Sequence, residues 1–342
     1  MRIAVDTGGG DCAPKNIVTG AVFAARQLGV GLTLVGSPDL IADELSHHGN
    51  VSDLDLRSIP AVEVVGMNEQ PVAGLRRKPG ASVQVAAQTV ASGDAAAFFS
   101  AGNTGATLLA ARSAFGMADG IDRPALAVTI PTSNRDAVLL DVGATVDCRA
   151  DNLLEFAVMG VVYAEVCLGI LFPKVGLLSI GEEAQVGNEL TRDAYQLLRS
   201  SSLNFVGNVE AKEVYAGRVD VIVCDGFTGN IALKVSEGLV EVSEKILGQE
   251  LGQDFVSRLG RYFSRRALQD FRRRVDYSEY GGATLLGVAG LAIVGHGGSS
   301  AKAVRNAIGL AFRCANADFV SKLTDGVSSR LVSDCCASRT VS

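Results

Sequence analysis

The sequence lacks most of the residues on which common catalytic sites depend. It has three histidines and no tryptophan, and neither a Cys/His cluster nor an H-E-x-x-H motif occurs, so no metal site is expected. The G-x-x-x-x-G-K-[ST] loop and the G-x-S-x-G elbow are also absent, which argues against P-loop nucleotide hydrolysis and against a serine hydrolase. The seven cysteines show no C-x-x-C spacing. With no secretion signal, this pattern favours reduced thiols in a cytoplasmic protein.

Long uncharged hydrophobic runs are missing as well. The longest apolar stretch, residues 156–172, contains Glu165 and is followed by Pro173, which favours a buried helix over a membrane span. The net charge of −6 argues against general nucleic-acid binding. A chain of 342 residues with 48% hydrophobic residues is nevertheless long enough for one large core.

Glycine is abundant, with 39 residues, and many glycines follow short apolar runs. The order of strand, polar turn and helix predicts an α/β fold with a mostly parallel sheet sandwiched by helices. We expect one domain over residues 1–327 and a frayed tail over 328–342. The expected strands are 2–5, 32–35, 61–65, 97–100, 125–130, 137–140, 175–179, 219–224 and 291–294. The expected helices are 16–28, 39–47, 83–91, 106–111, 151–168, 231–251 and 301–323.

Two strand-to-helix turns carry most of the chemical signal. In the first, the polar residues Ser100, Asn103 and Thr104 alternate with Gly102 and Gly105. Glycines allow close backbone approach, and a helix N-terminus offers unpaired N–H groups to an anion. The turn over residues 224–230 has the same pattern. Asn103 is therefore a candidate oxyanion donor, and its glycine and threonine neighbours are candidate phosphate contacts.

The loop after the first strand is a third candidate anion site. Gly8, Gly10 and Ala13 fit the dinucleotide pattern G-x-G-x-x-A, but no acidic residue ends the next strand, so a nicotinamide site is disfavoured. Gly9, Gly10 and Asp11 fit a phosphate-binding loop better. Other strand ends and helix starts supply further catalytic or substrate-binding candidates: Glu182, Asn188, Asp225, Asn230, Lys234 and His296.

Two basic stretches leave alternatives open. The loop expected over 69–82 contains Arg76, Arg77 and Lys78; it is either solvated or a clamp for an anionic substrate or acidic partner. Residues 255–274 combine an apolar stripe with many arginines, which indicates a membrane surface, an acidic carrier protein or a dimer interface. We expect two short helices here, broken near Arg265. The candidate contact residues are Phe263, Arg265, Arg266, Arg272, Arg273 and Arg274.

Several strings of residues together resemble one family, the bacterial phosphate acyltransferases of phospholipid synthesis, of the PlsX type. The resemblance covers about residues 1–325, in order and without large gaps. The matching strings are Ile3–Asp6, Gly9–Asp11, Ala13-Pro14, Ser100–Gly105, Ile121–Ala125, Leu139–Ala144, Asn208–Glu210, Cys224–Phe227 and Asp276–Ala283.

This resemblance implies a reaction without a cofactor. Inorganic phosphate attacks the thioester of a long-chain acyl–acyl carrier protein, giving acyl phosphate and free carrier protein. The product then serves a membrane glycerol-3-phosphate acyltransferase. The resemblance also implies an isocitrate and isopropylmalate dehydrogenase-like fold, a homodimer, a projecting helical hairpin at about 240–276, and peripheral membrane contact. Because phosphate is the nucleophile, the protein needs a phosphate cradle, an oxyanion donor and an apolar slot.

The chain departs from the family pattern in its first loop. Gly8 and Cys12 stand where the family usually has Met and His, and residues 79–81 also differ. An acid–base histidine at this loop is therefore not expected. Two other classes remain as alternatives: an oxidoreductase, by analogy of fold only, and a non-enzymatic scaffold that binds acyl carrier protein at the membrane.

Overall fold

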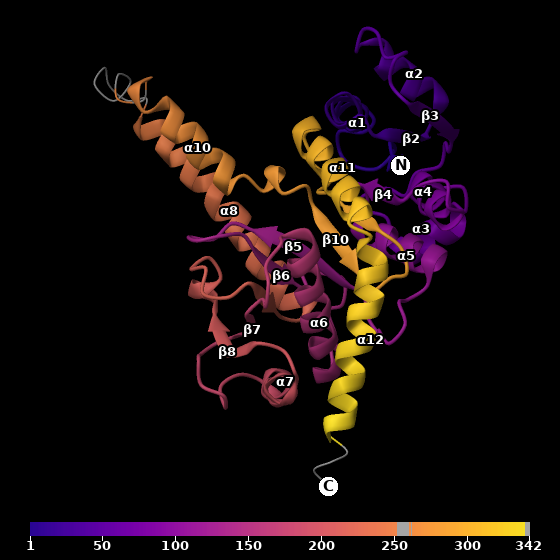
Figure 1. The fold of residues 1–342 in the computed structure, drawn as a ribbon. Coiled ribbons are helices and arrows are strands. Elements are labelled where there is room, and N and C mark those ends of the chain that lie inside the picture. The colour runs from indigo at the N-terminus through magenta and orange to yellow at the C-terminus, as the bar shows by residue number, and fades with distance from the viewer. Residues whose placement is uncertain (252–259, 261, 339–342) are drawn as a thin grey trace.

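The computed structural model describes residues 1–251, 260 and 262–338, which form one large sheet with helices on both faces (Figure 1). The strand order is β3-β2-β1-β4-β11-β10-β5-β6-β9-β7-β8. The strands are β1 (Arg2–Asp6), β2 (Gly31–Gly36), β3 (Leu56–Pro60), β4 (Ala97–Ser100), β5 (Ala125–Ile130), β6 (Ala137–Leu140), β7 (Val175–Ser179), β8 (Phe205–Glu210), β9 (Val221–Val223), β10 (Ala283–Leu286) and β11 (Ala292–Val294). The helices are α1 (Lys15–Leu28), α2 (Pro38–Ser46), α3 (Pro71–Arg77), α4 (Ser82–Ala91), α5 (Thr104–Phe115), α6 (Ala150–Cys167), α7 (Glu189–Ser200), α8 (Gly226–Glu250), α10 (Arg265–Val275), α11 (Ala301–Asn316) and α12 (Phe319–Ser338).

The sheet consists of two parallel sets of strands that run in opposite directions. β3, β2, β1, β4 and β11 are mutually parallel, and so are β6, β9, β7 and β8. Between the sets, β10 pairs antiparallel with β11 and β5, and β5 pairs antiparallel with β6. The prediction of a mostly parallel α/β sheet is confirmed. Because the strand direction reverses in the middle of the sheet, the carboxyl ends of β4 and β9 point in opposite directions.

The central strands are apolar throughout because both faces of the sheet are covered. In β1, Ile3 and Val5 belong to the core beneath α1, α6, α11 and α12, whereas Ala4 belongs to the core beneath α4 and α5. In β4, Phe99 and Phe98 divide between the same two cores. This double burial explains the unbroken hydrophobic runs from which the strands were predicted.

Two predicted segments near residue 60 are wrong. The strand expected over 61–65 is absent there; β3 lies earlier, where Arg57 and Ser58 are exposed at the edge of the sheet and conceal the pattern. The loop expected over 69–82 contains α3. Its first turn is fixed by Pro71 and by Gln70, whose side chain accepts a hydrogen bond from Ala73 N at 2.9 Å.

Three further boundaries differ from the prediction. The helix expected from residue 231 already begins at Gly226, because Asp225 caps it. The single helix expected over 301–323 is divided into α11 and α12 around Asp318, whose φ is +53°. The tail expected to fray from 328 continues as α12 to Ser338. Finally, β8 and β10 were not predicted.

Helices α8 and α10 lie side by side and extend beyond the sheet (Figure 1). An ion pair of 3.6 Å between Arg272 and Glu244 joins them. The break predicted near Arg265 coincides with the start of α10, while residues 255–259 and 261 of the predicted basic segment lie outside the described residues. None of the described helices is both long enough and apolar enough to cross a membrane.

Candidate active site

Three glycine-rich loops meet at the carboxyl ends of their strands. The first (residues 7–14) follows β1, the second (residues 101–103) follows β4, and the third (residues 295–300) follows β11. The amide of Asp11 donates to the carbonyl of Gly297 at 2.8 Å, which joins the first loop to the third. The first and second loops touch so closely that a Cβ on Gly9 would lie 2.7 Å from Gly102 N. Gly10 adopts a φ of +110°, which favours glycine. The structure thus brings Gly9, Gly10, Asp11 and Gly102 together at an edge where α/β sheets bind ligands.

The buried carboxylate of Asp6 fastens two of these loops from beneath. Its Oδ2 accepts the Ser100 hydroxyl at 2.7 Å, and its Oδ1 accepts the amide of Gly8 at 3.1 Å. Ser100 Oγ in turn accepts the amide of Gly102 at 3.1 Å. Burial raises the pKa of Asp6, although these hydrogen bonds oppose the shift. Ser100, which is fully buried, therefore shapes the loops from below.

Asn103 holds a neighbouring segment in place. Its Oδ1 caps α5 by accepting the amide of Ala106 at 3.0 Å. Its Nδ2 donates to the carbonyls of Gly66, Met67 and Glu69 at 3.3, 3.0 and 3.0 Å. The side-chain amide thereby ties residues 66–69 to the second glycine loop. The oxyanion role predicted for Asn103 remains a prediction.

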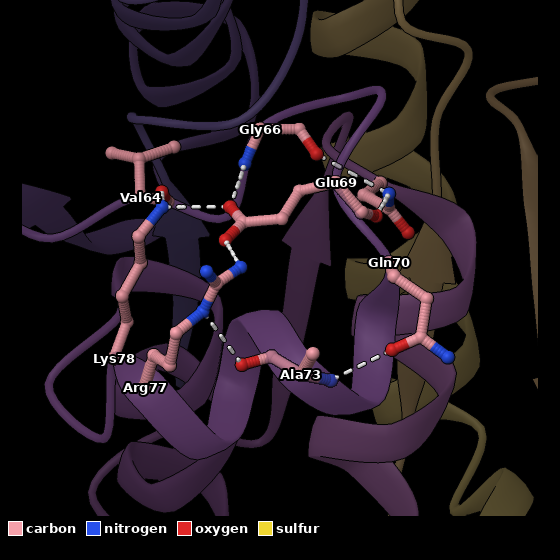
Figure 2. A network of polar contacts seen from close by, with 8 residues as sticks. Val64, Gly66, Glu69, Gln70, Ala73, Arg77 and Lys78 are labelled. Atoms are coloured by element: carbon pink, nitrogen blue, oxygen red, sulfur yellow. Dashed lines mark hydrogen bonds and ion pairs between the residues drawn. The ribbon is translucent and has the colours of Figure 1, made fainter.

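Within residues 66–69, which Asn103 holds in place, Glu69 is the centre of a network of ion pairs and hydrogen bonds (Figure 2). Its carboxylate binds Arg77 Nη2 and Lys78 Nζ, each at 2.7 Å, and accepts the amide of Gly66 at 3.1 Å. The hydrogen bond from Lys78, followed by that from Gly66, lowers the pKa of Glu69. Lys78 also donates to the carbonyl of Val64 at 2.7 Å. Two of the three predicted clamp cations are thus paired within their own segment.

A cavity of about 1050 Å³ connects these loops with the middle of the sheet. Thr104, Asp11, Met67 and His296 are among the residues that line it near the glycine loops. Many of its apolar lining residues come from β5, α8 and α10, among them Leu126, Val128, Ile130, Leu233, Val240 and Phe271. A large apolar cavity with a few converging polar groups is the usual form of a small-molecule site.

The loop after β9 supplies part of the same cavity. Asn230 and Lys234 line it, even though β9 and β4 run in opposite directions. Lys234 pairs with Glu237 at 2.9 Å. Asp225 caps α8 instead: its Oδ1 accepts the amide of Thr228 at 2.9 Å, and it does not line the cavity.

Two predicted substrate residues lie apart from this site. Glu182 follows β7 and is exposed, and its Oε1 lies 4.0 Å from Arg218 Nη1. Asn188 caps α7 by accepting the amide of Thr191 at 2.9 Å. Neither residue lines the cavity. Both follow β7, which lies farther from the middle of the sheet than β9 does, and the sequence pattern did not reveal this order.

His296 is an exposed residue of the third loop. It lines the cavity, and its Nδ1 accepts the amide of Gly298 at 3.1 Å. This bond assigns the proton of a neutral imidazole to Nε2. Within the part of the chain that the structure describes, no group of three or more His, Cys, Asp or Glu residues could hold a metal ion.

Asp6 and Met67 also belong to the site. Asp6 ends the first strand directly before the glycines, so its position was a usable signal. Met67 had no such signal: it lies in a loop, yet its Cε is only 2.6 Å from the position of a Cβ added to Gly297. Its side chain therefore packs against the third glycine loop at the cavity.

Comparison with known proteins decides the family. The sequence profile of the fatty acid synthesis protein family matches residues 1–322. A phosphate acyltransferase from Pelobacter propionicus is 50% identical over 311 residues, covering 91% of this chain and 90% of its own. The chain belongs to the phosphate acyltransferase family. A second member, from Trichlorobacter lovleyi, is 46% identical over 328 residues, covering 96% of this chain and 95% of its own.

The fold of this phosphate acyltransferase family member is also similar to solved structures of more distant proteins. A phosphotransacetylase from Streptococcus pyogenes superposes with a TM-score of 0.62 at 18% identity, covering 93% of this chain and 94% of its own. The EutD phosphotransacetylase from Staphylococcus aureus gives 0.60 at 15% identity, with the same coverage. At such identities the likeness establishes a common fold alone.

Cys12 is exposed in the first glycine loop. We expect Cys12→Ser to keep activity within about tenfold, a barrier change below ~1.4 kcal/mol, because phosphate attack needs no protein nucleophile. Steady-state rates of the two proteins test this. An acyl thioester trapped on Cys12 would contradict it.

Proposed function

We propose that this protein transfers a long-chain acyl group from acyl–acyl carrier protein to inorganic phosphate. The observation that carries the proposal is the cavity, which joins an apolar wall on β5, α8 and α10 to three glycine loops. The apolar part suits a hydrocarbon chain, which gains free energy by leaving water. The glycine loops suit phosphate, because they bring backbone amides close to an anion.

The chemistry then proceeds by direct attack. A phosphate oxygen forms the new bond to the thioester carbonyl carbon, the carbon–sulfur bond breaks, and the carrier-protein thiolate leaves and takes up a proton. Gly9, Gly10 and Gly102 let the glycine loops approach one another closely enough to form the phosphate cradle. The Asn103 cap does not use the first-turn amides of Thr104 and Gly105, so these are the oxyanion donors.

The residues from α8 and the third loop complete the site. Lys234 places a positive charge at the cavity, where it offsets the negative charge of phosphate and of the tetrahedral intermediate. Asn230 lies opposite Gly143, 3.7 Å from a Cβ added there, and is a donor to the substrate. His296 donates a hydrogen bond from its Nε2–H to the departing sulfur, and the proton that the thiolate takes up comes from the attacking phosphate.

One assay tests the reaction directly. Purified protein is incubated with palmitoyl–acyl carrier protein, with and without inorganic phosphate, and free carrier protein and acyl phosphate are measured. We expect both products to appear in equal amounts and only with phosphate. Release of carrier protein at the same rate without phosphate would show that the protein is a thioesterase, and no release in either sample would show that it only binds the carrier protein.

We further propose that α8 contributes to a homodimer. Val235, Leu239, Val242 and Ile246 form one stripe along this helix, and each is more than half exposed. Such a contiguous apolar stripe favours a partner surface.

We expect the Val242→Glu/Ile246→Glu double variant to shift the protein from dimer to monomer in sedimentation velocity. A monomeric wild-type protein would contradict the proposal.

We also propose that α8 and α10 form the helical hairpin and touch the membrane near Phe263, at the cytoplasmic face. There the acyl phosphate passes to a membrane glycerol-3-phosphate acyltransferase. Phe263 is 75% exposed, and the exposed Arg265, Arg266 and Arg273 lie nearby in sequence. Arg272 pairs with Glu244, and Arg274 is tied to the carbonyl of Thr132 at 2.9 Å. Exposed aromatic and basic residues together favour an anionic lipid surface.

Phe263→Glu is expected to weaken salt-sensitive binding to vesicles that contain an anionic phospholipid by about tenfold, because one charge and one lost aromatic contact oppose insertion. Vesicle co-sedimentation measures this. Leu40→Glu, at an apolar residue of α2 that is 53% exposed, is the matched control. If Phe263→Glu lowers acyl transfer in solution and wild-type protein never binds vesicles, the segment docks the carrier protein instead.

A further inference from the structure

Two cysteine sulfur atoms lie in contact on the face of the sheet opposite α4 and α5. Cys167 is the last residue of α6 and Cys314 lies near the end of α11, and their sulfur atoms are 3.3 Å apart. Cys314 is buried and Cys167 half-buried. A small solute therefore reaches the pair from the side of Cys167, whereas a protein reagent does not.

Cys314 is the member of the pair that is favoured as a thiolate. Donation from the Cys167 thiol lowers the pKa of Cys314; burial opposes this shift, and the neighbouring Arg313 adds to it. Lys322 adds positive charge near Cys167. A thiolate next to a second thiol is the arrangement that oxidises readily, because the sulfur that remains can displace the leaving group from the one that has reacted.

We propose that Cys167 and Cys314 form a redox modification site at which a peroxide joins α6 to α11 through a disulfide. One hydrogen peroxide is reduced to two waters while two thiols are oxidised. The peroxide oxygen–oxygen bond breaks as one sulfur forms a sulfenic acid, and the second sulfur then displaces hydroxide to form the sulfur–sulfur bond.

The bond would link the two halves of the fold. α6 packs on β6 and β9, whereas α11 packs on β4 and β11, so the disulfide joins helices from the two oppositely directed sets of strands. It closes a loop of about 150 residues, and constraining such a loop in the unfolded chain raises Tm on the order of 5 °C.

The test uses the full-length protein. It is treated with a small excess of hydrogen peroxide, remaining thiols are alkylated after unfolding, and peptides are mapped without reduction by mass spectrometry. We expect one linked peptide pair that contains Cys167 and Cys314 and is lighter than the sum of its parts by two hydrogen atoms. Its Tm should exceed that of the reduced protein, and dithiothreitol should reverse both changes.

Cysteines elsewhere in the chain serve as internal controls. Cys148 is also half-buried, but its thiol donates to the carbonyl of Thr145 at 3.2 Å, and burial raises its pKa to about 12, so it should stay a free thiol. Cys167→Ser should lack both the linked peptides and the rise in Tm. Recovery of Cys167 and Cys314 as free thiols after the exposed Cys12 has been oxidised would overturn the proposal, and this result needs no variant.

Discussion

Asn103→Ala is expected to lower the rate of acyl transfer to phosphate by about 10²–10³, as large an effect as losing one oxyanion donor, while the protein stays folded. The reason is the position of Asn103 between the oxyanion amides of α5 and residues 66–69. Without the side chain, the carbonyls of Met67 and Glu69 lose their donor, and the segment that carries Met67 is no longer held against the glycine loops. Steady-state rates at saturating acyl–acyl carrier protein measure the loss.

Asn103→Asp separates capping from tethering. Its carboxylate still accepts the amide of Ala106 and caps α5, but it has no N–H group for the carbonyls of residues 66–69. We therefore expect a Tm close to that of wild type and a rate close to that of Asn103→Ala. Asn204→Ala, which removes one amide bond to the carbonyl of Phe172 at the far end of the sheet, is the control. Near-normal turnover by folded Asn103→Ala would place the chemistry elsewhere.

Asp6→Ala is expected to lower kcat/KM for phosphate by about 10², because displacing a positioned group by roughly 1 Å has an effect of this size. The substitution leaves the hydroxyl of Ser100 and the amide of Gly8 without their acceptor. Nothing then fixes the first glycine loop against the second. The effect should fall mainly on KM for phosphate, since the acyl part of the cavity is unchanged.

The effect on stability needs a separate control, because Asp6→Ala also leaves buried polar groups without hydrogen-bond partners. This lowers the free energy of unfolding by about 1–3 kcal/mol. Thr89→Val removes a buried hydroxyl that donates to the carbonyl of Val85, away from the site; it should lower Tm without changing KM. If Asp6→Ala and Thr89→Val change the kinetics equally little, Asp6 serves stability alone.

Asp6→Asn adds a test by pH. Because burial raises the pKa of Asp6 in the folded protein, folding favours the protonated carboxyl. Wild-type stability should therefore fall as pH rises from the unfolded pKa, about 3.9, towards the folded one. Asp6→Asn should remove this contribution to the pH dependence of the free energy of unfolding. An unchanged slope would show that Asp6 does not titrate there.

Local sequence was sufficient for most of the fold. Strands such as β1, β4 and β6 are buried on both faces, so their hydrophobic runs are unmistakable, and each is followed by glycine and then by a helix. Where a strand lies at an edge of the sheet, the signal fails. β3 exposes Arg57 and Ser58, and β8 at the other edge exposes Val206.

The sequence by itself determined which chemical groups are available: glycine turns at Gly9 and Gly102, a capping amide at Asn103, a basic segment after Val64 and the strings that identify the family. Each of these depends on neighbours within a few residues, where propensity and turn chemistry decide.

Only the tertiary structure decided which of these groups meet. The strand order places β9 beside β6, and Asn230 and Lys234 on the helix that follows β9 line the cavity with Thr104; Glu182 and Asn188 follow β7, farther out in the sheet, and lie outside the cavity. The place of a strand in the sheet is set by pairing with partners distant in sequence. For the same reason, no local pattern could show that the Asn103 amide is engaged by residues 66–69 or that two cysteines far apart in the chain touch.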